Sequence, residues 1–172
     1  LTDGDTTFDE GETSKRFYFL VGDDTVDEPA ETIVLDLTVE ASDRPAEVSD
    51  GQQIITIIDD DEPAVYSLGG DMVVSERNGQ SRLFLIKVTR SDATGAAEIA
   101  LTLSGTANAP GSEVDFERVG GSNVFADGET ELDVYYRLTD DDLQEGQEQI
   151  IFDLSIVATD NPGVLGSARQ IV

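Results

Sequence analysis

The sequence contains a long internal repeat. The stretch GETSKRFYFLVGDDTVDEPAETIVLDL, which begins at Gly11, recurs 117 residues later as GETELDVYYRLTDDDLQEGQEQIIFDL. The two copies align without a gap from Phe8 opposite Phe125 to Ile55 opposite Val172, with 17 identities over 48 positions. A period of this length is that of a whole domain, because solenoid and propeller repeats are shorter. The sequence therefore predicts tandem domains.

The period also predicts where the domains begin and end. Residues 1–61 are expected to be the C-terminal half of one repeat, and residues 62–172 a nearly complete second repeat that stops inside its last strand. The junction is expected within DDDEPAVYS, residues 59–67, where three acids and a proline separate two apolar stretches.

The secondary structure is expected to be β throughout. Val, Ile, Thr, Phe and Tyr are frequent in residues 16–22, 32–42, 52–59, 82–90 and 97–105. In most of these stretches apolar and polar residues alternate, and Gly, Asp, Asn and Pro separate them. The second repeat is predicted to contain strands at 64–68, 71–76, 81–91, 96–104, 113–118, 130–139, 148–158 and 167–172. This number of strands in about 110 residues predicts an all-β, immunoglobulin-like antiparallel β-sandwich. In the strand at 82–90 we expect Phe84, Ile86 and Val88 to point inward.

Composition excludes several classes of function. The chain has 37 acidic and 10 basic residues and a net charge of −27, so it has no basic stripe for nucleic acid. Histidine, the commonest general base, is absent, and so is cysteine, which would supply a thiolate. For this reason we do not expect an enzyme. The sequence contains no run of about 18 apolar residues, so this segment is not expected to insert into a membrane.

The acids form clusters at the ends of predicted strands. Asp23–Glu28 with Glu31 is repeated as Asp140–Glu145 with Glu148, and a third cluster is Asp59–Asp61. Loops gather at the two ends of a sandwich, so acids from separate loops can converge, and calcium prefers six to eight oxygen ligands. The alternative is that Asp at strand ends serves turn geometry alone. Retention of four acids in both copies favours calcium.

The order of the motifs resembles that of the Calx-β domain. The second repeat carries VVSE (73–76), RLFLIKVTR (82–90), GTANAPGSEVDF (105–116), FADGET (125–130) and LTDDDLQEGQEQIIFDLS (138–155), and the first repeat ends in ITIIDDDEP (55–63). Calx-β domains are immunoglobulin-like sandwiches that bind calcium at one end. They occur in sodium/calcium exchangers and as repeats in large extracellular adhesion proteins, including bacterial ones.

The resemblance implies a set of calcium ligands in each copy. In the second repeat these are Glu76, Asp115, Asp140, Asp141, Glu145 and Glu148, with the carbonyl oxygen of Leu143 as an addition. In the first repeat they are Asp23, Asp24, Glu28, Glu31, Asp59, Asp60 and Asp61. The acid triplet that closes the first repeat has no counterpart within the second, and the first repeat lacks the upstream Glu.

Three functional hypotheses follow. The leading one is a structural and adhesive extracellular module in which calcium rigidifies loop ends and domain junctions, with neighbouring Calx-β repeats and a cell-surface or matrix ligand as partners. The second is a regulatory calcium sensor in the cytoplasmic part of an exchanger-like membrane protein. The third is that the acidity is an adaptation to solubility or high salt, with no specific metal, which predicts an equal response to any salt.

Overall fold

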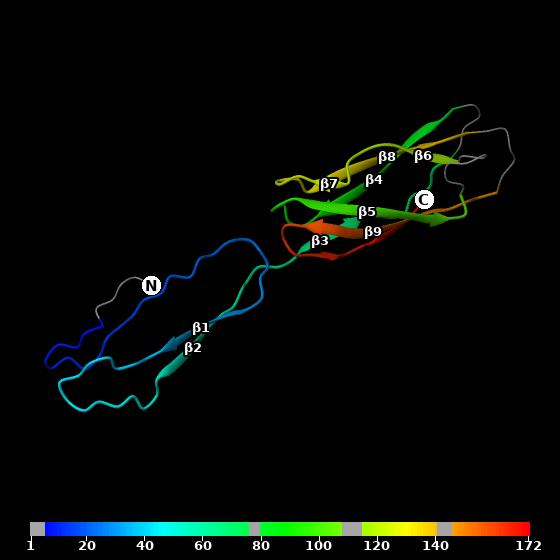
Figure 1. The fold of residues 1–172 in the computed structure, drawn as a ribbon. Coiled ribbons are helices and arrows are strands. Elements are labelled where there is room, and N and C mark those ends of the chain that lie inside the picture. The colour runs from blue at the N-terminus through cyan, green and yellow to red at the C-terminus, as the bar shows by residue number, and fades with distance from the viewer. Residues whose placement is uncertain (1–5, 76–79, 108–114, 141–145) are drawn as a thin grey trace. The chain divides into compact units, whose positions relative to one another are not determined.

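The structure, a computed structural model, describes residues 6–75, 80–107, 115–140 and 146–172, and every regular element in these ranges is a β-strand. The all-β prediction is confirmed. The chain divides into two compact units (Figure 1), the first formed by Leu1–Thr25 and Pro29–Asp59 and the second by Val26–Glu28 and Asp60–Val172. The described ranges contain no helix that is long and apolar enough to cross a membrane.

The second unit is a β-sandwich of two sheets that face each other (Figure 1). One sheet has the order β10 (Gly163–Leu165), β3 (Ala64–Leu68), β4 (Arg82–Arg90), β8 (Glu131–Leu138) and β6 (Phe116–Gly120). The other has the order β11 (Arg169–Ile171), β9 (Ile150–Thr159), β5 (Ala97–Gly105) and β7 (Val124–Phe125). All neighbours are antiparallel except β10 and β3, which are parallel.

The core of the second unit lies between these sheets. In β4 the side chains of Phe84, Ile86 and Val88 are buried, as the alternation predicts, because the opposite face of the strand is solvated. The ring of Tyr136 in β8 stacks on Phe84, with ring centres 5.6 Å apart, and packs edge-on against Phe152 in β9 at 5.0 Å. Aromatic contacts therefore join the two sheets.

A buried arginine holds loops at one end of this sandwich. Arg90 is only 4% exposed, and its guanidinium lies 5.0 Å from the ring centre of Phe125. It donates hydrogen bonds to five backbone carbonyl oxygens, those of Ala93, Thr94, Gly95, Ala126 and Glu129. A buried charge is tolerated when its donors are satisfied in this way.

The first unit contains a single pair of strands in its described part, β1 (Glu31–Asp36) and β2 (Gln52–Ile57), which are antiparallel. None of its described apolar side chains is fully buried, and Tyr18, Leu20 and Ile58 are exposed. The unit therefore has a hairpin without a sandwich core.

Some predicted strands differ from those observed. Residues 16–22 were expected to form a strand and do not, because the described part of the first unit offers no partner strands like those that flank the equivalent β8. Residues 71–75 of the predicted strand 71–76 also lie outside any strand, although Met72 donates a backbone hydrogen bond to Ile171. The short strands β7 and β10 were not predicted, since two or three residues carry too little alternation to detect.

Candidate metal centre

One end of the second unit contains three of the predicted ligands. Phe116, the first residue of β6, is paired with Leu138, the last residue of β8. Asp115 precedes this pair and Asp140 follows it, so the antiparallel register brings the two acids to the same end of the sheet. The backbone N–H of Thr139 donates to the carbonyl oxygen of Asp115 at 2.7 Å, which fixes the loop position of both residues.

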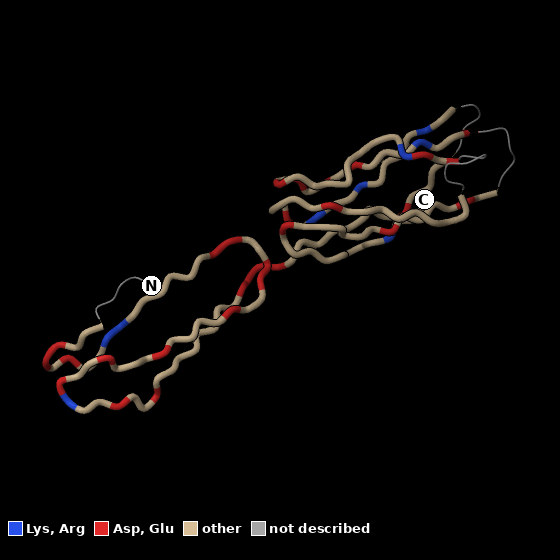
Figure 2. Tube along the Cα trace, in the orientation of Figure 1, with Lys and Arg blue, Asp and Glu red and all other residues tan. Residues whose placement is uncertain are grey.

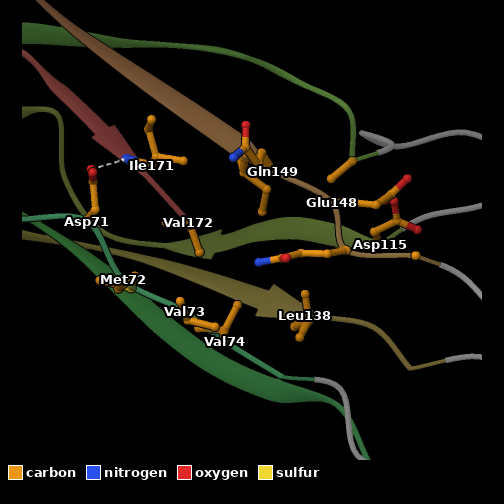
Figure 3. A pocket seen from close by; sticks show the side chains of 14 residues that line it. Asp71, Met72, Val73, Val74, Asp115, Leu138, Glu148, Gln149, Ile171 and Val172 are labelled. Carbon is orange, nitrogen blue, oxygen red and sulfur yellow. Dashed lines mark hydrogen bonds between the residues drawn. The ribbon is translucent and has the colours of Figure 1, made fainter.

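The start of β9 brings Glu148 to the same end. Glu148 lies two residues before Ile150, and it lines one pocket together with Asp115 and Leu138. In the view of Figure 3 the carboxyl groups of Asp115 and Glu148 are drawn next to each other at one end of this pocket. Asp115 precedes a strand of one sheet and Glu148 precedes a strand of the other, and the two acids therefore converge on this pocket.

These acids differ in burial. The Asp115 side chain is 7% exposed, whereas Asp140 and Glu148 are half-buried. Transfer of a carboxylate from water to such a position costs several kcal/mol unless hydrogen bonds or a cation compensate. A position of this kind is suited to a bound cation.

The pocket has a volume of about 630 Å³ and a mixed lining. Apart from Asp115 and Glu148 its walls are mainly apolar, with Met72, Val74 and Leu138 among them. A third acid, Asp71, also lines the pocket. Its Oδ1 accepts a hydrogen bond from the backbone N–H of Ile171, the last residue of β11, at 2.7 Å (Figure 3).

The chemistry of the donors fits calcium, because carboxylate oxygens are the ligands that hard cations prefer. Within the described ranges no three acidic side chains lie close enough together to hold a metal ion. Four of the residues predicted for this site, Glu76, Asp141, Leu143 and Glu145, lie outside the described residues.

The Calx-beta domain family model matches residues 1–61 and again residues 59–171. The chain belongs to the Calx-beta family. This confirms the resemblance seen in the sequence, and it places the chain in a non-catalytic, calcium-associated family of β-domains. A search of curated proteins finds no match.

In this Calx-beta chain the acids predicted for the first repeat are divided between the two units. Asp23, Asp24, Glu31 and Asp59 belong to the first unit, and Glu28, Asp60 and Asp61 to the second. Glu31 opens β1 opposite Ile57, so Glu31 and Asp59 lie toward the same end of the hairpin. Asp23, Asp24, Glu28, Glu31 and Asp60 are exposed, whereas Asp59 and Asp61 are half-buried. The sequence prediction for this copy stays a prediction.

One retained acid has a structural role that the sequence analysis missed. Glu129 accepts a hydrogen bond from the backbone N–H of Ala126 at 2.8 Å and donates its own N–H to the carbonyl oxygen of Ala126 at 3.0 Å. Glu12 makes the same two contacts with Asp9, each at 3.0 Å. The sequence signal for this role is the repeated GET motif, in which the Glu is the last residue of a tight turn.

Further acids at the other end of the Calx-beta sandwich also serve the backbone. Asp160 accepts from the N–H of Ala96 and Asp127 from that of Gly95, both at 2.9 Å. Burial acts to raise the pKa of Asp92, but hydrogen bonds from Thr94 and Asn161 outweigh it and hold the pKa below its ordinary value. Many acids in this chain are therefore explained without a metal.

Proposed function

We propose that this chain is a calcium-binding structural module of an extracellular adhesive protein, in which calcium rigidifies the loops at one end of each Calx-beta repeat. The observation that carries the proposal is the convergence of the buried Asp115 and the half-buried Glu148 on one pocket, with Asp140 in the adjoining loop. Calcium there would offset the repulsion between carboxylates and the cost of their burial.

The proposed repeats follow the internal period. Residues 1–61 form the C-terminal half of one repeat and residues 62–172 most of the next. The ligands of the second repeat are Asp115, Asp140 and Glu148, joined by Glu76, Asp141, Glu145 and the carbonyl oxygen of Leu143. The first repeat contributes Asp23, Asp24, Glu28, Glu31 and the triplet Asp59–Asp61.

The net charge of −27 supports a role for cations in the whole chain (Figure 2). Acidic residues are spread over both units and outnumber basic ones, and such self-repulsion works against compact structure unless cations reduce it. Domains arranged in tandem suit a protein that must span a distance at a cell surface. In that setting a cation that stiffens loops also stiffens the array.

Calorimetric titration with calcium and magnesium tests the proposal. Asp115→Asn keeps the shape of the side chain but removes its charge, and we expect it to weaken calcium binding at least about tenfold, or about 1.4 kcal/mol. The matched control is Glu117→Gln, in β6 two residues after Asp115, since the Glu117 side chain is 44% exposed and pairs with Arg137 at 2.7 Å.

The control should bind calcium within about twofold of the unchanged chain, and melting of both variants in chelator establishes that they fold. Equal affinity of Asp115→Asn and the unchanged chain, or no preference for calcium over magnesium, would overturn the proposal. X-ray scattering with and without calcium then distinguishes a structural role of calcium from a role as a regulatory signal. A profile that calcium shifts to a different angle between the units would support a sensor instead.

A further inference from the structure

The strand β4 carries apolar side chains on both of its faces. Phe84, Ile86 and Val88 are buried in the core. Leu83 and Leu85 alternate with them on the outer face and are 65% and 38% exposed. An antiparallel sheet with one solvated face usually shows polar residues on that face. The outer face of this strand therefore has the composition of a surface that another molecule covers.

The outer face continues as an apolar row across β8 and β6, which lie beside β4 in one layer (Figure 1). Leu85 is paired with Tyr135 of β8, which is 40% exposed. Opposite Tyr135 the register of β6 shifts, so that Val119 and Gly120 both lie beside it. Val119 is 39% exposed, and a Cβ at Gly120 would meet the ring of Tyr135 at 3.9 Å. We call Leu85, Tyr135 and Val119 the apolar row.

Ion pairs flank the apolar row on both sides. On one side Arg137 donates a hydrogen bond to Glu117 at 2.7 Å. On the other side Lys87 donates to Glu131 at 2.6 Å and lies 3.5 Å from Asp133. These pairs comprise two basic and three acidic side chains, whereas the whole chain has 10 basic and 37 acidic residues. The face is therefore close to neutral in a strongly acidic chain.

Two of these charged residues lie symmetrically about the apolar row. Asp133 and Arg137 belong to β8, two residues before and two residues after Tyr135, and so point to the same face. The contacts of Asp133 are long, since the O–H of Tyr135 donates to its Oδ2 at 3.4 Å and Lys87 Nζ lies 3.5 Å from its Oδ1. Arg137 donates to Glu117 through one Nη atom, and a guanidinium has five N–H donors. Both residues can therefore join a further ion pair.

We propose that the outer face of β4, β8 and β6 binds the same face of a second copy of this chain. A two-fold axis that runs across the strands along the apolar row brings the two rows into contact, and it sets Arg137 of each copy against Asp133 of the other. Two sheets pack face to face in this way when their strands lie within about 30° of one another. The contact is self-complementary, because every pairing occurs twice.

Charge favours a second copy over other occupants. Chains with a net charge of −27 repel one another, and contact through a more acidic face adds to that repulsion. On this face each carboxylate already has a basic neighbour, and the two-fold arrangement adds two pairs of opposite charge. A strongly basic partner would instead prefer the more acidic surfaces of the chain.

The dimer is expected to be weak. Neighbouring strands are about 4.8 Å apart, so three of them present less surface than the roughly 800 Å² per partner of a standard interface. Weak contacts of this kind are effective between molecules held side by side, where the effective concentration reaches about the millimolar range. The contact involves none of the acids assigned to calcium, so it is independent of the proposed function.

NMR spectra of the 172-residue chain in chelator, recorded from about 20 µM to about 1 mM, test the contact. We expect concentration-dependent amide shifts that centre on Leu85, Tyr135 and Val119, and a dimer in sedimentation at the higher concentrations. Leu85→Glu places a charge on the two-fold axis and should weaken the dimer at least about tenfold. The matched control is Val157→Glu, which makes the same change in charge at a 57% exposed residue of β9, in the other sheet, and should stay within about twofold.

An exchange of charges tests the register. Asp133→Arg and Arg137→Asp should each weaken the dimer, because like charges then face each other across the axis. When the two variants are mixed, they should associate at least about tenfold more tightly than either variant alone, since both contacts of the mixed dimer again join opposite charges. Thermal melts of each variant establish that it folds.

Shifts that centre on the outer face, weaken with Leu85→Glu and return on mixing would establish the interface. Shifts that stay constant over the whole concentration range would overturn the proposal, as would shifts confined to exposed apolar residues of the first unit such as Leu20 and Ile54. Equal weakening by Val157→Glu would attribute the association to overall charge and contradict this face. Failure of the mixed variants to associate would contradict the two-fold register.

Discussion

Phe8 and Phe125 occupy equivalent positions of the internal repeat, yet Phe8 is 56% exposed whereas Phe125 is fully buried. The same contrast separates Val21 from Leu138 and Leu37 from Leu154. The side chains of the second unit are covered by strands such as β4 and β5, which have no counterpart among residues 6–59. Equivalent apolar residues therefore form a core only where the strands of a second sheet cover them.

Local features, by contrast, are the same in both units. Gly11 and Gly128 have φ angles of +86° and +88°, and each is the third residue of the same four-residue turn, which ends in Glu. Asp153 pairs across strands with Arg169, and its counterpart Asp36 accepts a hydrogen bond from Gln52 at 2.9 Å. Turns and strand register depend on residues within the copy, whereas burial depends on the strands that pack against it.

The largest expected effect compares Phe152 with its counterpart Leu35. Phe152 is fully buried, and Phe152→Ala should lower the free energy of unfolding of the second unit by about 3–5 kcal/mol through loss of contacts and a cavity. Leu35→Ala, at a half-buried site, should shift the same denaturant transition by less than about 1 kcal/mol. Equal shifts would show that the first unit has a core of its own.

The next effect concerns a residue that only the second unit has. Arg90→Ala leaves five backbone carbonyl oxygens without this donor and removes the contact with Phe125, so we expect a loss of about 3 kcal/mol in denaturant unfolding. Arg82→Ala is the control, since Arg82 is exposed and makes one long hydrogen bond, of 3.3 Å, to Ser75. A similar loss in both variants would contradict this role of Arg90.

A smaller effect compares the two glycine turns. Gly128→Ala should cost about 1 kcal/mol, because the positive φ angle disfavours a side chain although no atom lies within 4 Å of the added Cβ. Gly11→Ala has the same geometry, but it should leave the main melting transition unchanged because none of the described apolar side chains of the first unit is fully buried. If both variants lower this transition equally, the two units unfold together.

The smallest effect depends on pH. The hydrogen bond and charge of Arg169 hold the pKa of Asp153 below its ordinary value, so this contribution to stability is present above the ordinary pKa and is lost as the pH falls through the lowered one. Arg169→Gln copies the Gln52 arrangement and should move the pKa of Asp153 back up in an NMR titration. A pKa that stays where it was would assign the shift to another group.

The sandwich was predictable where one strand face is buried. Phe84, Ile86 and Val88 alternate with solvated residues, and the structure follows that pattern. Residues 16–22 are rich in aromatic and aliphatic residues but form no strand, because a strand needs partners and the sequence pattern does not report whether they are present.

The candidate site was predictable only in part. The position of acids at strand ends indicated that the cluster with Asp140 and Glu148 lies at one end of the sandwich, since loops meet there, whereas Asp115 was implied by the resemblance to the Calx-β domain alone. The burial of Asp115 and the pocket beside it depend on the packing of both sheets and have no signal in the sequence. The turn role of Glu12 and Glu129 shows that retention of an acid in both copies does not by itself indicate a metal.

The most direct test of the account is a set of thermal melts of this chain after chelation, with millimolar calcium, with magnesium, and with sodium chloride at matched ionic strength. If calcium binds the folded second unit, it should stabilise that unit by about 2.7 kcal/mol at a hundredfold excess over Kd, and the other two salts should have smaller effects. An equal rise in Tm with all three salts would mean charge screening alone and would contradict a calcium site at Asp115 and Glu148.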